Sequence, residues 1–267
     1  MRHRILIAGA VAAAVVVAAR FVQPSNHRDW SVDQAVLPSA EVAPPLVTIR
    51  NIRNFDYQDT SRYTPAYYDK TFDLRKLDSA WFVVEPFDQP GAAHTFVSFG
   101  FGDSDYVAIS IEIRKEKGES FSALKGLLRR YELMYVIGDE RDLIRLRTNY
   151  RKDQVYLYRI DAPKAKIEEM FLAMVTRANA LREKPEFYNT LTNTCTTNLV
   201  RHVNQISAER VPRSFAVLLP ANSDKLAYDI GLIDRTFTFD ETKARAWIND
   251  KAEKADDDPQ FSRRIRE

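Results

Sequence analysis

The sequence predicts an α+β fold in which an antiparallel sheet packs against helices. Two segments of alternating residues, 93–101 and 106–114, flank the turn-forming residues 102–105 and predict a β-hairpin. Residues 163–182 have the apolar spacing of an amphipathic helix. Strands follow strands along the chain instead of alternating strictly with helices, which favours α+β over α/β.

The first 22 residues predict an export segment. Two arginines and a histidine precede the apolar run 5–19, an order that is typical of secretory signals. Extended to Val22, the run has about 18 residues and marginally suffices to span a bilayer, while Val17-Ala18-Ala19 also fits a cleavage site. We expect a single-pass inner-membrane helix or a cleaved signal peptide, and a periplasmic location for the rest in either case. A buried core helix is the alternative.

The remaining chain divides into three parts by composition. Residues 23–45 are polar and contain four prolines, which predicts a tether with little regular structure. Residues 46–254 predict an extracytoplasmic catalytic domain, and residues 255–267 a charged, frayed tail. Periodicity and turn residues predict strands at 46–49, 79–84, 93–101, 106–114, 133–137, 143–148 and 155–160.

Helices are expected at 120–130, 163–182, from Cys195 onward, and over 241–254. The first should bury four apolar residues, namely Phe121, Leu124, Leu127 and Leu128. The second should bury a stripe of seven, namely Ile167, Met170, Phe171, Met174, Val175, Ala178 and Leu181.

Charge and motif content exclude several classes of protein. Lys and Arg total 39 and Asp and Glu total 37, so the formal net charge of +2 gives no electrostatic argument for binding nucleic acid. The sequence contains no nucleotide-binding glycine motif, and its scattered histidines lack the spacing of metal ligands. We therefore expect no cofactor, no metal and no nucleic-acid partner.

Cys195 is the residue on which a catalytic interpretation rests. It is the only cysteine, so it has no intramolecular disulfide partner. Thr and Asn residues crowd upstream of it and apolar periodicity begins downstream, which places the thiol in the first turn of a helix. Helix N-termini lower the pKa of a thiol, and their N–H groups can hold an oxyanion. A buried structural cysteine is the alternative.

His94 is the best candidate for the base that a catalytic thiol needs. His3 and His27 lie in the export segment and the tether, and His202 is two helical turns from Cys195, about 10 Å away. We expect His202 to be a surface residue of that helix. A hairpin turn centred on Asp103 would pair residues whose numbers sum to 206.

This register would place Glu112 directly opposite His94. Opposed side chains are about 5 Å apart at Cβ, so a carboxylate there can orient an imidazole as the third member of a triad does. A solvent-facing Glu112, balanced by the neighbouring basic residues, is the alternative. The basic residues Arg145, Arg147 and Arg151, in and just after the 143–148 strand, could face anionic head groups, although a solvated strand face is the simpler interpretation.

Five runs of residues resemble the DUF4105 family, the Lnb N-terminal periplasmic domain of lipoprotein intramolecular transacylase-like proteins. These are IRNIRNF (49–55), HTFVSFGFG (94–102), ISIEIRKEKGE (109–119), DERDLIRLRTNY (139–150) and FYNTLTNTCTT (187–197). The resemblance extends from about residue 29 to residue 219. The order His, Glu, Cys is also similar to permuted NlpC/P60-like thiol enzymes, which implies a papain-like core. One departure is Thr194, where the family is expected to have Asn.

The resemblance implies a Cys-His-Glu triad of Cys195, His94 and Glu112. It also implies a pocket shaped by neighbouring residues, for which we name Tyr188, Asn189, Asn193, Ser98 and Arg114. The implied function is a membrane-anchored periplasmic acyltransferase or hydrolase that forms an acyl-thioester on the cysteine. Its partners would be a membrane lipid or lipoprotein substrate and the inner membrane. An NlpC/P60-type cell-wall peptidase or amidase and a non-catalytic envelope domain are the alternatives.

Overall fold

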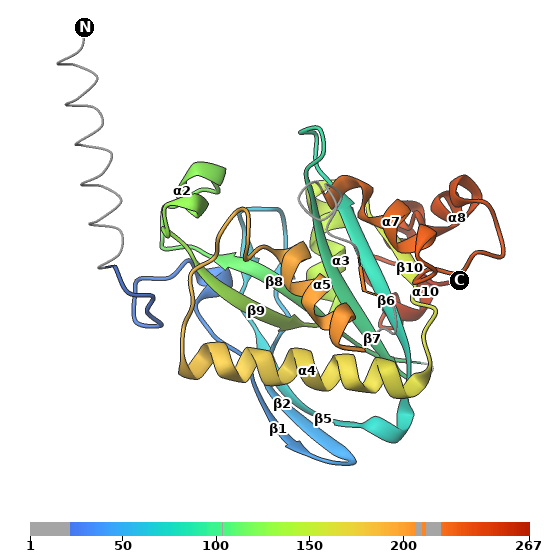
Figure 1. The fold of residues 1–267 in the computed structure, drawn as a ribbon, viewed down its shortest axis with the longest axis horizontal. Coiled ribbons are helices and arrows are strands. Elements are labelled where there is room, and N and C mark those ends of the chain that lie inside the picture. The colour runs from blue at the N-terminus through green and yellow to red at the C-terminus, as the bar shows by residue number, and fades with distance from the viewer. Residues whose placement is uncertain (1–21, 103, 207–209, 212–219) are drawn as a thin grey trace, which may run out of the picture.

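The fold is organised around one large mixed sheet (Figure 1). The structure is a computed structural model, and it describes residues 22–102, 104–206, 210–211 and 220–267. Within these residues the strands are β1 (Ser39–Ala43), β2 (Leu46–Arg53), β3 (Asp56–Tyr57), β4 (Tyr63–Thr64), β5 (Tyr67–Asp73), β6 (Leu77–Pro86), β7 (Ala93–Phe101), β8 (Asp105–Arg114), β9 (Glu132–Gly138) and β10 (Tyr156–Arg159).

The strand order in the sheet is β1-β2-β9-β8-β7-β6-β10, and β5 pairs with β2. The described pairs of this sheet are antiparallel except for β2 with β9. β3 and β4 form a separate two-stranded ribbon. This mixture of sheet and helices confirms the predicted α+β class.

Helices cover the sheet on both of its faces. Their bounds are η1 (Val32–Gln34), η2 (Leu74–Lys76), α2 (Ala123–Leu127), α3 (Glu140–Arg145), η3 (Leu146–Arg151), α4 (Lys164–Glu183), α5 (Cys195–Ile206), η4 (Pro220–Asn222), α7 (Ser223–Asp229), α8 (Phe239–Ala246), α9 (Asn249–Lys254) and α10 (Phe261–Arg264). α4, α5 and α7 contribute to one hydrophobic core, and α3, α9 and α10 to a second. Because both faces are covered, all nine residues of β7 are buried.

The central hairpin has the register that the sequence predicts. β7 pairs with β8 from Phe96–Ser110 to Phe101–Asp105, so the numbers of paired residues sum to 206. The long helix α4 is also as predicted, and the seven apolar residues of its stripe are all buried. Both elements depend on local periodicity and turn chemistry, which a sequence states directly.

The segment 23–45 has more regular structure than we predicted for a tether. It contains η1 and β1, and β1 pairs with β2 along five residues. Trp30 is buried and lies 4.3 Å from the guanidinium carbon of Arg114, measured to a ring centroid. Arg114 also donates hydrogen bonds to the backbone oxygens of Gln34 and Ala35, at 2.9 and 2.8 Å. These long-range contacts fix the segment against β8.

The tail 255–267, predicted to be frayed, is likewise folded onto the domain. Phe261 and Ile265 are one helical turn apart on α10 and following residues, and both are fully buried in the second core. Arg266 pairs with the buried carboxylate of Glu140 at 2.5 Å. The many charged residues of this tail led to the wrong prediction, because they obscured two apolar residues at helical spacing in the sequence pattern.

The predicted strand over 143–148 is wrong, because this segment belongs to α3 and the π-helix η3. Asp139 caps α3 by accepting a hydrogen bond from the backbone N–H of Arg141. Arg145 and Arg147 are buried, at 5% and 4% exposure. Neither residue therefore faces solvent or lipid head groups. The π-helix ends at Arg151 and is capped by Lys152, which has a left-handed backbone conformation.

The helix predicted over 120–130 is shorter and is oriented differently from our expectation. α2 has only five residues, and the four apolar side chains that we expected to be buried are all exposed. Gly126 is the buried residue of α2, because it packs against Tyr188 and Thr190. The helix expected over 241–254 divides into α8 and α9 around Trp247.

The predicted membrane helix or signal peptide lies outside the described residues, apart from Val22. Along the described chain no helix is long and apolar enough to span a bilayer.

Candidate active site

Cys195 is the first residue of α5, as the sequence predicted. Thr194 precedes it and closes the helix start with Thr197: the backbone N–H of Thr194 donates to the Thr197 hydroxyl at 2.7 Å, and the N–H of Thr197 donates to the Thr194 hydroxyl at 3.2 Å. Before this cap, Asn189 and Asn193 close a tight turn. The thiol is half-buried at a capped helix N-terminus, where the helix dipole favours an anion.

The side chains of His94 and Cys195 are electrostatically coupled, and each shifts the pKa of the other. Burial by itself would lower the pKa of His94, but the Glu112 carboxylate and the thiol outweigh burial and raise that pKa to about 10. Burial would likewise raise the pKa of Cys195, but the neighbouring imidazole lowers it. The two opposite shifts favour a thiolate–imidazolium pair at neutral pH.

Glu112 and Ser110 stand behind the imidazole. His94 Nε2 lies 2.7 Å from Ser110 Oγ and 3.1 Å from Glu112 Oε1. Ser110 Oγ donates to the same carboxylate oxygen at 2.7 Å. The Ser110 hydroxyl has one hydrogen and donates it to Glu112, so it must accept a hydrogen bond from Nε2–H of His94. Nδ1 of His94 is then left as the proton acceptor for the thiol.

A buried arginine holds this carboxylate in place. Arg147 Nη2 donates to Glu112 Oε1 at 3.1 Å, and its Nε donates to Glu85 Oε2 at 2.6 Å. Glu85 pairs with His94 across β6 and β7 and is fully buried. Burial opposes ionisation of Glu112, but His94, Arg147 and the Ser110 hydroxyl hold its pKa well below the ordinary value. The site is therefore a network of compensated charges.

Two threonines line the other side of the thiol. Thr196 Oγ1 lies 3.7 Å from Cys195 Sγ and 3.3 Å from Thr95 Oγ1. The Thr196 hydroxyl and the backbone N–H of Thr95 both lower the pKa of Cys195. These donors would stabilise negative charge on sulfur.

The other predicted site residues divide into two groups. Tyr188 lies within electrostatic reach of Cys195 and Glu112, and its pKa is raised mainly by burial and then by these two groups. Asn189 and Asn193 shape the turn before the thiol: Asn189 Oδ1 accepts from the backbone N–H of Leu191, at 3.0 Å, and Asn193 Nδ2 donates to the Phe187 carbonyl, at 2.8 Å.

Ser98 and Arg114, by contrast, do not line the site. Ser98 Oγ donates to Glu140 Oε1 at 2.5 Å, further along β7. Arg114 binds the N-terminal segment 26–35 through its hydrogen bonds and its stacking on Trp30. In the sequence pattern both residues lie on the same strand face as His94 and Glu112. They lie two or more residues further along their strands, however, and a side chain at that distance has different neighbours.

His202 is also different from our expectation. It is buried at 6% exposure, and its Nε2 lies 2.8 Å from the Tyr135 hydroxyl. Burial, followed by repulsion from Arg177, lowers its pKa to about 4, so it is neutral at physiological pH. His202 is therefore a core residue of α5 and not a surface histidine.

Sequence reasoning missed three members of the network, Ser110, Glu85 and Arg147. Ser110 was detectable, because the predicted register places it on the same strand face as His94 and Glu112. The pairing of β6 with β7 would have added Glu85. Arg147 was hidden by the wrong strand prediction over 143–148.

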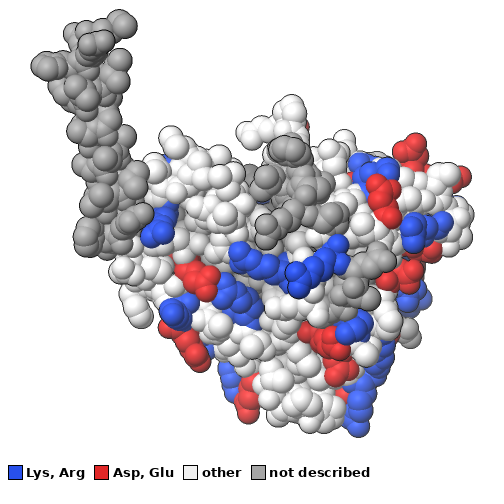
Figure 2. All heavy atoms as spheres, viewed as in Figure 1, with Lys and Arg blue, Asp and Glu red and all other residues white. Residues whose placement is uncertain are grey.

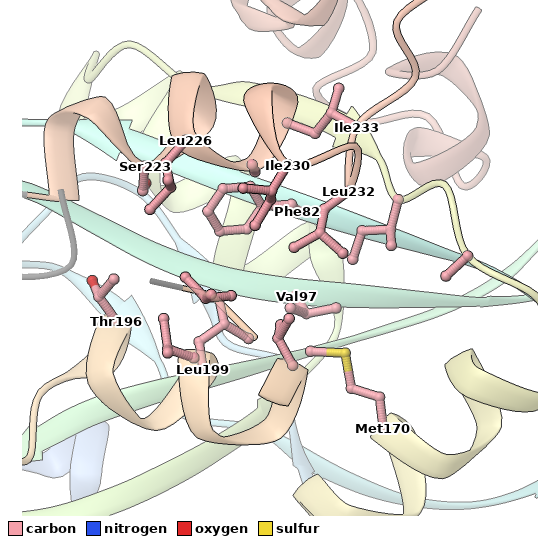
Figure 3. A pocket seen from close by; sticks show the side chains of 16 residues that line it. Phe82, Val97, Met170, Thr196, Leu199, Ser223, Leu226, Ile230, Leu232 and Ile233 are labelled. Atoms are coloured by element: carbon pink, nitrogen blue, oxygen red, sulfur yellow. The ribbon is translucent and has the colours of Figure 1, made fainter. Parts of the chain in front are cut away.

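An apolar pocket lies between α5, α7 and the sheet (Figure 3). Cys195 and His94 do not line it, but Thr196, whose hydroxyl is 3.7 Å from the sulfur, does. Thr196 and Ser223 are the polar side chains among its sixteen lining residues, and the other fourteen are apolar. α5 supplies Thr196, Leu199, Val200 and Val203, one helical face that starts beside Cys195. Figure 3 shows Leu199, Val97 and Met170 on one side of this space and Phe82 and Leu226 on the other.

A second, more open depression lies on the other side of the turn that precedes the thiol. It is lined by polar and aromatic residues, among them Arg129, Tyr188, Asn189, Asn193 and Arg201. Within the described chain, no group of three or more His, Cys, Asp or Glu side chains is arranged to hold a metal ion.

The fold and the site define an α+β domain with a lone cysteine at a helix start beside a strand histidine. The family model described as the Lnb N-terminal periplasmic domain matches residues 63–221, more than half of the 267-residue chain. The chain belongs to this family, and the description supports the predicted periplasmic location. The matched range includes His94, Glu112 and Cys195. No curated protein and no solved structure matches the chain.

Proposed function

We propose that this protein is a periplasmic cysteine-dependent acyltransferase or hydrolase that acts on lipid or lipoprotein esters. The observation that carries the proposal is the coupling of Cys195 to the buried His94, whose Nε2 lies 3.1 Å from Glu112 Oε1. A structural cysteine has no need of a buried histidine whose pKa is raised to about 10. The arrangement of nucleophile, base and orienting carboxylate is that of a catalytic triad.

Each group has a definite role in this mechanism. Nδ1 of His94 takes the proton of Cys195, and the thiolate attacks the ester carbonyl carbon. The new C–S bond forms as the ester C–O bond breaks, and the leaving alcohol takes the proton from the imidazolium. An amine then attacks the thioester and returns the thiol, or water does so in a hydrolase. Glu112 and Ser110 hold the imidazole throughout.

Donors near the sulfur would stabilise the tetrahedral intermediates. The N–H groups at the start of α5 point out of the helix end beside the thiol, and the Thr95 backbone N–H also favours the thiolate. Arg147 contributes indirectly, because it holds Glu112 in place without reaching the thiol.

The apolar pocket favours a lipid ester over a peptide. Fourteen apolar side chains, joined to the thiol through Thr196, suit an acyl chain, whereas a peptide backbone would bury its polar groups there without partners. A cell-wall peptidase or amidase is the second candidate, and the polar depression at Asn189 and Arg201 favours it. The proposal includes a permuted NlpC/P60-like core, which the order His, Glu, Cys and the helix-start thiol support.

The predicted N-terminal anchor fits this substrate class. A chain held at the inner membrane by residues 1–22 would meet lipid and lipoprotein esters at high effective concentration. The anchor remains part of the proposal, together with a periplasmic orientation of the domain.

Alkylation of the thiol across pH tests the proposal directly. The wild-type protein should react with iodoacetamide well below pH 8.5, and His94→Ala should lose this reactivity. His27→Ala is the matched control, because His27 is exposed and outside the site. The acyl-enzyme should then form with a long-chain lipid ester and be detected by mass spectrometry as an adduct that hydroxylamine removes.

Two outcomes would count against the proposal. A thiol that titrates like free cysteine in the wild type would leave an envelope domain with a structural cysteine. A reactive thiol that forms an adduct with cell-wall peptides but not with lipid esters would favour the peptidase.

A further inference from the structure

We propose that α2 and its neighbours dock the domain on an anionic membrane surface. The α2 patch consists of the apolar residues Phe121, Leu124, Leu127, Leu128 and Leu191 together with Lys125, Arg129 and Arg130. Docking through this patch would be a second membrane contact, separate from the N-terminal segment. It does not depend on the chemistry of the proposed function.

The apolar members of the α2 patch are exposed although they are large and close together. Phe121 is 57% exposed, Leu124 64% and Leu191 55%, and Leu127 and Leu128 exceed 40%. Four of the five fall within eight consecutive residues, so they form one surface and are not scattered. Figure 2 shows the surface at α2 as mostly uncharged on the visible face. Clustered exposed leucines mark an interaction site more often than a solvated surface.

The charged residues around these leucines favour an anionic membrane over a protein as the binding partner of the patch. Residues 120–131 contain three basic residues and no acidic residue. Lys125 has only a distant ion pair with Glu119, at 4.0 Å. Leucine and phenylalanine side chains flanked by lysine and arginine are typical of segments that lie in the interface of an anionic bilayer. A purely apolar protein partner would leave these cations without counter-charges.

The position of the patch in the molecule agrees with a membrane occupant. The described chain begins at Val22, and in the sequence the apolar run 5–19 directly precedes it. Pro24 and Arg129 line the same depression, and the Ser25 backbone N–H donates to Glu132 at 3.1 Å. An anchored chain would therefore emerge from the bilayer next to the α2 patch.

The patch is also connected directly to the candidate active site. Thr190 donates a hydrogen bond to the Ala123 carbonyl at 2.8 Å, and a Cβ on Gly126 would lie 3.1 Å from the Tyr188 ring. Tyr188 in turn lies within electrostatic reach of Cys195. Docking of α2 would thus bring the turn that carries the thiol to the lipid surface, where an ester substrate would be found.

Quenching of tryptophan fluorescence by brominated lipids tests the docking. The full chain is reconstituted into phosphatidylcholine–phosphatidylglycerol vesicles with brominated acyl chains. Leu124→Trp reports on the patch, and Leu46→Trp is the matched control. Leu46 is 44% exposed and starts β2, in the hairpin that Figure 1 shows at the opposite end of the domain from α2. Wild-type protein gives the background of the three native tryptophans.

We expect the added fluorescence of Leu124→Trp to be quenched several-fold more than that of Leu46→Trp. We also expect the difference to shrink when phosphatidylglycerol is omitted. Equal quenching at the two positions would overturn the inference, whether α2 is in water or is covered by a second copy of the chain. Alkylation of Cys195 in the same vesicles separates the proposals, because a reactive thiol with equal quenching refutes only the docking, and strong quenching with an inert thiol refutes only the enzyme.

Discussion

Replacement of Glu112 by Gln tests the electrostatic core of the site with a minimal change of shape. His94 is 8% exposed, and burial alone would lower its pKa. At an effective dielectric constant of 20, unit charges at the observed 3.1 Å attract by about 5 kcal/mol. This energy corresponds to about four pKa units, which is close to the gap between the ordinary 6.5 and the value of about 10. In Glu112→Gln the pKa of His94 should therefore fall, because only the thiol is then left to oppose the effect of burial.

The thiol reports this change. In the wild type the pKa of Cys195 is lowered and that of His94 is raised, so the ion pair persists from below pH 8.5 up to about pH 10. Without the imidazolium, a thiol with an ordinary pKa of about 8.5 is only about 3% thiolate at pH 7. Alkylation at pH 7 should thus slow roughly 30-fold, and its inflection should move to pH 8.5 or above.

The measurement is the iodoacetamide rate between pH 5 and 10, followed by intact mass. Every added label reports Cys195, because the chain has one cysteine. Glu116→Gln is the matched control, since Glu116 pairs with Arg28 outside the site. If Glu112→Gln titrates like the wild type, the carboxylate does not set the ionisation of the pair and the triad argument fails.

Three further substitutions probe the surroundings of the thiol. Arg147→Met should lower the free energy of unfolding in urea by about 3–5 kcal/mol, because the buried Glu85 keeps only the more distant Arg151, at 3.8 Å; a second change, Glu85→Gln, should restore part of the loss. Leu226→Trp, which fills the apolar pocket, should reduce turnover of long-chain esters relative to short-chain esters, and an unchanged ratio would contradict an acyl-chain site. Gly126→Ala should cost about 1–3 kcal/mol in thermal unfolding, since its Cβ would lie 2.3 Å from the Thr190 hydroxyl; an unchanged stability would show that α2 moves freely.

Local patterns in the sequence determined the elements that carry the proposed triad. The alternation of residues on either side of a turn centred on residue 103 was sufficient for the hairpin, and its register brought Glu112 to His94. The cap-forming residues before Cys195 predicted the start of α5. The stripe of α4 was also complete in the sequence. These features depend on neighbours within one turn or one hairpin, so their physical causes are written in consecutive residues.

The tertiary structure decided which charged residues are compensated and where apolar surface remains. The alternation of residues around Arg147 is compatible with a strand. Only the tertiary structure shows that Arg147, in η3, pairs with Glu112 and Glu85. Trp30 and Phe261 looked like parts of a tether and a frayed tail, but distant partners bury them. Conversely, the leucines of α2 remain exposed, because the helix packs against Tyr188 with the side that carries Gly126.

The apolar pocket also became visible only in three dimensions, because it assembles residues from α5, α7 and the sheet that are more than a hundred positions apart. Burial and compensation depend on the partners of a residue, and those partners are set by long-range contacts that a single sequence does not state.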